Sequence, residues 1–92
     1  MLTRVMALEL APYKIRVNSV SPGIIDISGG QSLTEDYKRA MTRMVPWGRM
    51  GRPEDVAKIV LLVSDPAAEY MTGQVIPVDG GLSSGRFGIP TS

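Results

Sequence analysis

The chain has 92 residues with ten basic and nine acidic side chains, so it forms one domain at most, and its formal net charge of +1 argues against a nucleic-acid partner. It contains neither cysteine nor histidine, which argues against a metal site. The longest apolar run, 59–63, is far shorter than the ~20 residues of a membrane span, and no secretory signal is recognisable. We therefore expect a cytoplasmic protein with no membrane partner.

Residues 1–13 have the spacing of an amphipathic helix that Pro12 brings to an end. The apolar positions are Leu2, Val5, Met6 and Leu10. No capping residue precedes this stripe, which is already present at residue 2. The pattern predicts a helix cut from a longer one; the alternative is a short terminal helix that frays.

Residues 15–20 are rich in β-branched side chains and predict a buried strand that runs into a loop at Pro22 and Gly23. Proline cannot donate to a sheet ladder, and glycine lets a ligand or another backbone come close. We expect function to reside in this loop.

Residues 33–44 return to helical spacing after two glycines, and the pair Ser32 and Glu35 is typical of a capping box. A short helix of this kind is equally typical of a substrate-side flap and of a plain surface helix. The connector 45–52, with one tryptophan and two glycines, follows it.

Residues 53–64 predict a helix, because proline and two carboxylates suit its start. The helix is strongly apolar, so we expect it to be largely covered. Residues 74–78 predict a second strand, and Pro77 within it indicates a sheet edge. Strand, helix and strand make a βαβ unit, for which we expect parallel strands and a right-handed crossover. Ligands of such sheets bind beyond the carboxyl ends of the strands, where Pro22 and Gly23 fall.

Three segments resemble the C-terminal part of a short-chain dehydrogenase/reductase, in the order and at the spacing of that family. They are the run 2–23 ending in Arg-Val-Asn-Ser-Val-Ser-Pro-Gly, the run Gly-Arg-Pro-Glu-Asp-Val-Ala at 51–57, and the run 72–81 ending in Val-Asp-Gly-Gly. The resemblance implies an α/β fold, the C-terminal portion of a Rossmann-like doubly wound parallel sheet. Residues 1–92 would form a single partial domain, in the order helix, strand, flap helix, helix and edge strand, with 29–50 as substrate flap and 82–92 as tail.

The resemblance also implies NAD or NADP as cofactor. Pro22, Gly23 and Ile25 would contact the nicotinamide ring and its carboxamide, largely through backbone groups. Ile27 stands where the family usually has a threonine, and Ser28 would supply a hydroxyl with a shift of one residue.

The flap of the resembled family varies with the substrate, and four side chains here indicate an apolar wall, with core packing as their alternative role. They are Tyr37, Met41, Met44 and Trp47. The family's glycine-rich loop, catalytic serine and Tyr-x-x-x-Lys pair precede the matched region, and no tyrosine in this sequence has a lysine four residues on. No catalytic residue is assigned, and hydride transfer by this chain alone is not expected.

Two functions remain open. The chain is either the C-terminal part of an NAD(P)(H)-dependent oxidoreductase acting on carbonyl or alcohol groups, or a non-catalytic interaction fragment. In the resembled family the first helix and the last strand line subunit interfaces. We therefore expect a homo-oligomer or association with a full-length relative.

Overall fold

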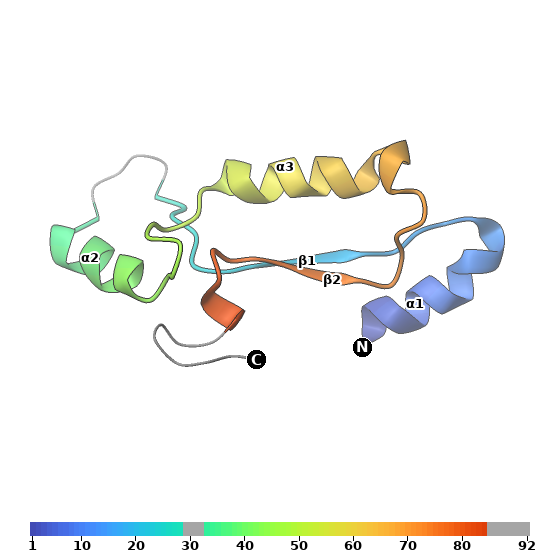
Figure 1. Ribbon diagram of the computed structural model, residues 1–92, viewed down its shortest axis with the longest axis horizontal. Coiled ribbons are helices and arrows are strands. Elements are labelled where there is room, and N and C mark those ends of the chain that lie inside the picture. The colour runs from blue at the N-terminus through green and yellow to red at the C-terminus, as the bar shows by residue number, and fades with distance from the viewer. Residues whose placement is uncertain (29–32, 85–92) are drawn as a thin grey trace.

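The structure is a computed structural model that describes residues 1–28 and 33–84, and its elements follow the predicted order (Figure 1). The helices and strands are α1 (Leu2–Leu10), β1 (Ser19–Pro22), α2 (Glu35–Arg43), α3 (Pro53–Ser64) and β2 (Val75–Val78). Short 3-10 helices lie at Ala11–Tyr13, Pro66–Ala68 and Leu82–Ser84.

β1 and β2 form a parallel two-stranded sheet in the register Ser19 to Val75 through Pro22 to Val78. Parallel pairing was predicted and is confirmed. The predicted first strand, 15–20, was wrong in its limits, because the ladder begins only at Ser19. Before that point the chain is held by bonds outside the ladder: the Val17 N–H donates to Thr72 Oγ1 at 3.0 Å.

Both prolines of the sheet face away from the partner strand. The N–H groups of Ser19 and Gly23 donate to the carbonyls of Gln74 (2.9 Å) and Val78 (3.1 Å). Since backbone groups alternate in direction along a strand, Pro22 turns its nitrogen outward, and the same alternation turns Pro77 outward on β2. Neither proline therefore costs the ladder a hydrogen bond, and β2 is an edge strand among the described residues, as Pro77 predicted.

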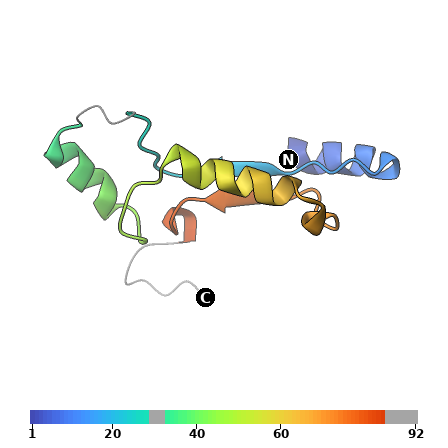
Figure 2. The same cartoon turned by 90° about the horizontal axis from the view of Figure 1, so that it is seen from above.

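α3 packs along both strands, whereas α1 lies near the start of β1 (Figure 1). Viewed from above, with α3 in front of the sheet, β2 lies to the left of β1 when the strands point upward (Figure 2). The crossover is thus left-handed, and the right-handed expectation was wrong. The rule assumes a helix that returns directly to the sheet, but residues 23–74 also carry α2 and a long connector.

Few side chains of the described residues are fully enclosed: only Ala7 and Val45 are buried apolar residues. The prediction that residues 53–64 are largely covered was wrong, since Leu61 is 72% exposed and Leu62 is 64% exposed. A two-stranded sheet covers only one face of α3. The chain exposes 7292 Å², against about 5,200 Å² for a compact monomer of its mass.

α2 begins at Glu35, capped by Thr34, whose side-chain oxygen accepts a hydrogen bond from the Tyr37 N–H at 3.2 Å. The cap predicted at Ser32 lies outside the described residues. Glu35 and Asp36 occupy the first turn, where carboxylates favour the positive end of the helix dipole. In the part of the chain that the structure describes, no helix has the length and apolar character needed to cross a membrane.

Gly80→Ala should weaken the structure around Trp47 more than Gly48→Ala does. Both glycines have positive φ (+62° and +97°), so both substitutions strain the backbone. A Cβ on Gly80 would also lie 2.7 Å from Val45 Cγ1, whereas nothing lies within 4 Å at Gly48. Overpacking adds about 1–3 kcal/mol. Hydrogen exchange of the Trp47 amide, which bonds to the Gly80 carbonyl, measures the difference; equal protection in the two variants would contradict this packing.

Candidate functional site

The loop after β1 is pinned to the end of β2 by the close approach of two backbones. A Cβ on Gly23 would lie 2.6 Å from the Asp79 Cβ and 2.8 Å from the Asp79 Cα. The Pro-Gly pattern allows either a ligand or another backbone to come close to the glycine, and here a neighbouring backbone does so. Pro22 and Gly23 bring the chain out of the sheet at its carboxyl edge, where the ligand site was expected.

Ile25 follows this turn and pairs with Gly51 in an isolated parallel bridge. The Gly51 N–H donates to the Ile24 carbonyl at 2.8 Å, and the Asp26 N–H donates to the Gly51 carbonyl at 2.9 Å. These two bonds use the carbonyl of the residue before Ile25 and the N–H of the residue after it. Its own N–H and C=O point the other way and make no hydrogen bond with any residue in 1–28 or 33–84.

Asp26 and Ser28 close a small turn immediately after Ile25. The Ser28 N–H donates to Asp26 Oδ1 at 2.9 Å. The Ser28 hydroxyl and then this N–H, with a weaker contribution from the charge of Lys38 on α2, lower the pKa of Asp26 below its usual value. Ser28, predicted to hold cofactor, is thus engaged by Asp26, while Ile27 is 83% exposed.

An ion pair that the sequence analysis missed closes the other side of the site. Arg49 Nη1 and Nη2 lie 2.8 and 3.3 Å from the two carboxylate oxygens of Asp55. The Arg52 N–H donates to Asp55 Oδ2 at 2.8 Å, and the Asp55 N–H donates to the Arg52 carbonyl at 2.9 Å. The carboxylate that pairs with Arg49 therefore also caps the start of α3. The Arg49 guanidinium and then the Arg52 N–H lower the pKa of Asp55 to about 2.

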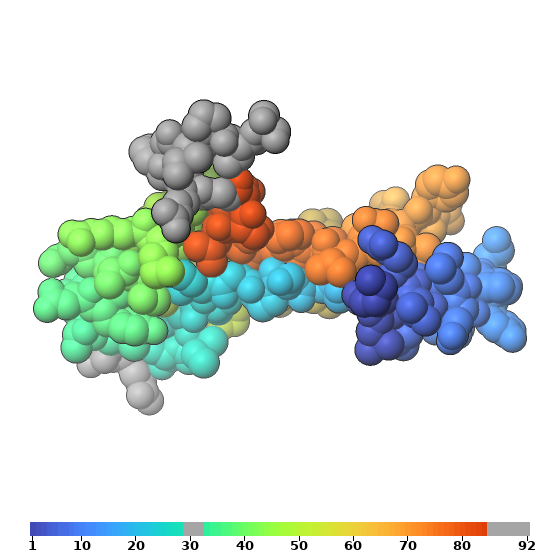
Figure 3. Space-filling model, turned by 90° about the horizontal axis from the view of Figure 1, so that it is seen from below, coloured from blue at the N-terminus to red at the C-terminus, as the bar shows by residue number. Residues whose placement is uncertain are grey.

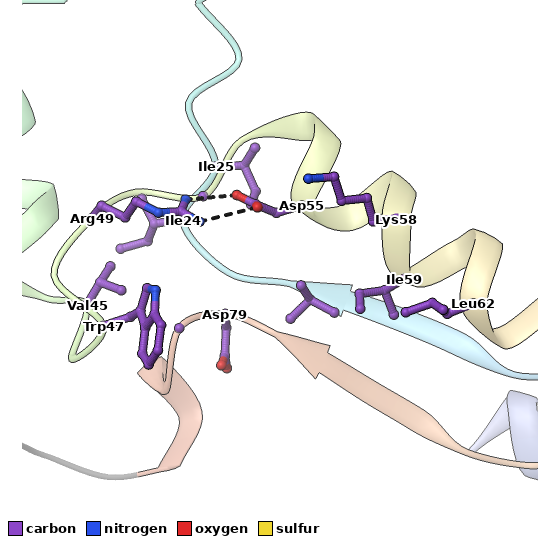
Figure 4. Close-up of a pocket in the computed structure, with 13 residues that line it drawn as sticks. Ile24, Ile25, Val45, Trp47, Arg49, Asp55, Lys58, Ile59, Leu62 and Asp79 are labelled. Atoms are coloured by element: carbon purple, nitrogen blue, oxygen red, sulfur yellow. Dashed lines mark hydrogen bonds and ion pairs between the residues drawn. The ribbon is translucent and has the colours of Figure 1, made fainter.

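A groove of about 410 Å³ runs between the connector and α3 (Figure 4). Its lining is mostly apolar and consists of Ile24, Ile25, Val45, Trp47, Arg49, Gly51, Asp55, Lys58, Ile59, Leu62, Val78, Asp79 and Gly80. Trp47 is 75% exposed, and its backbone N–H donates to the Gly80 carbonyl at 2.9 Å. A volume of this size suits a small ligand.

The structure brings only some of the predicted site residues to this groove. Ile25 and Trp47 line it, whereas the other cofactor and flap candidates do not. Tyr37, Met41 and Met44 lie on or just after α2, which stands apart from the sheet at the far end of the molecule from α1 (Figure 3). Within the described residues, no three carboxylates come close enough together to hold a metal ion.

A family model described as enoyl-(acyl carrier protein) reductase matches residues 1–83. The chain belongs to the short-chain dehydrogenase/reductase family. Members of this family use NAD(P). The α/β unit of this chain, with two parallel strands and three helices, is consistent with part of the Rossmann fold of these enzymes.

Several curated members of the short-chain dehydrogenase/reductase family are similar to this chain. The 3-oxoacyl-(acyl-carrier-protein) reductase FabG of Thermotoga maritima is 42% identical over 81 residues, which cover 88% of this chain and 33% of that protein. The FabG of Aquifex aeolicus is 42% identical over 80 residues, 87% of this chain and 32% of that protein. The tropinone reductase homolog At2g29340 of Arabidopsis thaliana is 43% identical over 88 residues, 94% of this chain and 29% of that protein. The chain spans about a third of the length of these relatives.

The carboxyl group of Asp55 should titrate near pH 2 and make the start of α3 sensitive to acid. Because its folded pKa lies below the unfolded value of about 3.9, the ion pair stabilises the fold above pH 4, and this stabilisation is lost as the pH falls from 4 to 2. NMR titration of the carboxyl carbon measures this midpoint. Arg49→Gln should raise the midpoint toward 4; a native midpoint already near 4 would mean that the pair does not form in solution.

Proposed function

We propose that this chain supplies the nicotinamide-contacting loop of an NAD(P)(H)-dependent oxidoreductase that acts on carbonyl or alcohol groups. The observation that carries the proposal is the backbone of Ile25. Its N–H and C=O face the same side at the carboxyl edge of the sheet, with no partner among the described residues. A primary carboxamide presents one acceptor oxygen and one donor nitrogen, so a single residue of extended backbone is complementary to it.

The surrounding residues fit this cofactor to different degrees. Pro22 and Gly23 direct the backbone toward it, but the space at Gly23 is taken up by Asp79, and Ser28 is engaged by Asp26. Ile25 is therefore the principal contact, and Ser28 contributes only if its bonds with Asp26 rearrange. Nothing in these residues distinguishes NAD from NADP.

The apolar groove beside Ile25 is the natural place for the hydrocarbon part of a substrate, with Trp47 at its mouth. When bound, the cofactor donates or accepts the hydride. The chain's own residues bind and orient, and they supply no Tyr-x-x-x-Lys acid/base pair. We therefore expect these 92 residues alone to bind nicotinamide weakly and not to turn substrate over.

The 3-acetylpyridine analogue should bind less tightly than the nicotinamide form of the same dinucleotide. The analogue replaces the amide nitrogen by a methyl group and so removes the donor to the Ile25 carbonyl. One hydrogen bond contributes about 0.5–1.5 kcal/mol, so we expect the Kd to rise about three- to tenfold. The measurement is an NMR titration of the 15N-labelled chain that follows the Ile25 amide, with a full-length relative as positive control. Equal affinities would contradict carboxamide recognition by Ile25.

A second candidate function is a non-catalytic one, association with another copy or with a full-length relative. The observation that favours it is the apolar surface of α1, where Leu2 and Leu8 are each 72% exposed and Val5 is about half exposed. Apolar side chains gathered on one helix are typical of protein interfaces. This function does not exclude the first.

The double substitution Leu2→Gln and Leu8→Gln should weaken self-association of the chain. Burying each leucine contributes about 1–2 kcal/mol, so the loss of both should raise the dissociation constant at least tenfold. Sedimentation equilibrium measures the change. Leu61→Gln on α3 is the matched control, because it removes an equally exposed leucine outside this surface. A monomeric wild-type chain at high concentration would contradict the association.

A further inference from the structure

We infer that the groove beside α3 binds a small carboxylate with a hydrocarbon chain, which lies along the groove and places its carboxylate beside Lys58. The inference deepens the proposed function and rests on it only in calling this ligand a substrate. In that case the substrate is an acid that also carries a carbonyl or hydroxyl group. The apolar walls of the groove and the arrangement of charge along them carry the inference.

Apolar side chains line the groove from three elements. Ile59 and Leu62 come from α3, Val45 and Trp47 from the connector, and Val78 from β2 (Figure 4). Although both line the groove, Leu62 is 64% exposed and Trp47 is 75% exposed. A hydrocarbon chain bound here would remove this surface from water, and each methylene that is fully buried strengthens binding about fourfold.

Four charged residues line the groove, two positive and two negative, and they are arranged unevenly. Arg49 and Asp55 neutralise each other in an ion pair at 2.8 Å. The carboxylate of Asp79 points away from α3 (Figure 4), and its two oxygens accept from backbone N–H groups of the turn that follows it. An anion bound against α3 therefore meets the positive charge of Lys58 as the nearest uncompensated charge.

Lys58 stands at the end of the groove where Asp55 lies, and its side chain runs back along α3 toward that residue (Figure 4). Among the described residues Lys58 has no ion pair, not even with Glu54 one turn earlier, and Asp55 is held by Arg49. Lys58 and Leu62 are four residues apart and so lie on the same face of α3. This face offers a cation and then an apolar side chain one turn further on, which is complementary to a carboxylate with a hydrocarbon chain.

The test compares octanoate with octanamide, its neutral analogue, by fluorescence titration of the 92-residue chain. Trp47 is the only tryptophan of the sequence and lines the groove, so its emission reports on ligand bound there. Lys58→Gln should weaken octanoate binding about two- to fivefold, as expected of an exposed ion pair, and leave octanamide unchanged. The control is Lys14→Gln, which removes an exposed lysine outside the groove and should change neither affinity.

A pair of leucines on α3 tests the position of the hydrocarbon chain. Leu62→Gln should weaken octanoate and octanamide alike, by about fourfold for the loss of one methylene-sized contact. Leu61→Gln is the matched control, because Leu61 is similarly exposed on the same helix but does not line the groove. Equal effects of the two substitutions would contradict binding in this groove.

A further measurement needs no variant. Raising the salt concentration from about 0.05 to 1 M should weaken octanoate relative to octanamide, because the screening length falls to about 3 Å. Octanoate binding that responds to neither Lys58→Gln nor salt would overturn the role of Lys58, and no binding at millimolar octanoate would overturn the whole inference. Both results leave the proposed function standing, since the Ile25 amide and the dinucleotide test it separately. Octanoate binding without any response of Ile25 to the dinucleotide would overturn only the proposed function.

Discussion

The close fit of Gly23 against the backbone of Asp79 is the constraint on which the rest of the site depends. It fixes the carboxyl ends of β1 and β2 relative to each other, since any side chain at position 23 would overlap Asp79. At the other end, Asn18 donates to the Met71 carbonyl and accepts from the Gln74 N–H. Held at both ends, a ladder of four residue pairs has one register, and Ile25 reaches its place beside Gly51 as a result.

The connector between α2 and α3 packs against the same carboxyl edge of the sheet. Side chains of the connector pack directly against the two glycines after Asp79. A Cβ atom added to Gly80 would meet Val45 and Trp47, and one added to Gly81 would meet Pro46. The groove therefore has one wall from the connector 45–52, a second wall from α3, and a floor from the carboxyl end of the sheet. A change of residues in the connector alters the groove without altering the ladder.

Local patterns predicted the elements but not how they meet. Apolar periodicity and the placement of proline predicted the order of helices and strands, and parallel pairing followed from the length of the crossover. The start of β1 was missed because side chains bind backbone groups that a longer ladder would use, as Thr72 Oγ1 does when it accepts from the Val17 N–H at 3.0 Å. At the site, the Pro-Gly loop was predictable, but the pairing of Arg49 with Asp55 was not, since Arg49 lies in an irregular connector and Asp55 in α3, with five residues between them.

The outward turn of the two prolines gives both outer edges of the sheet the same limit. On the outer edge of β2, Val75 offers its N–H and its C=O, but Pro77 has no N–H. On the outer edge of β1, Val20 offers both groups, and Pro22 has no N–H. A further strand on either side, whether from the same polypeptide or from a partner, would therefore find a gap in its hydrogen bonds toward the carboxyl end of the sheet.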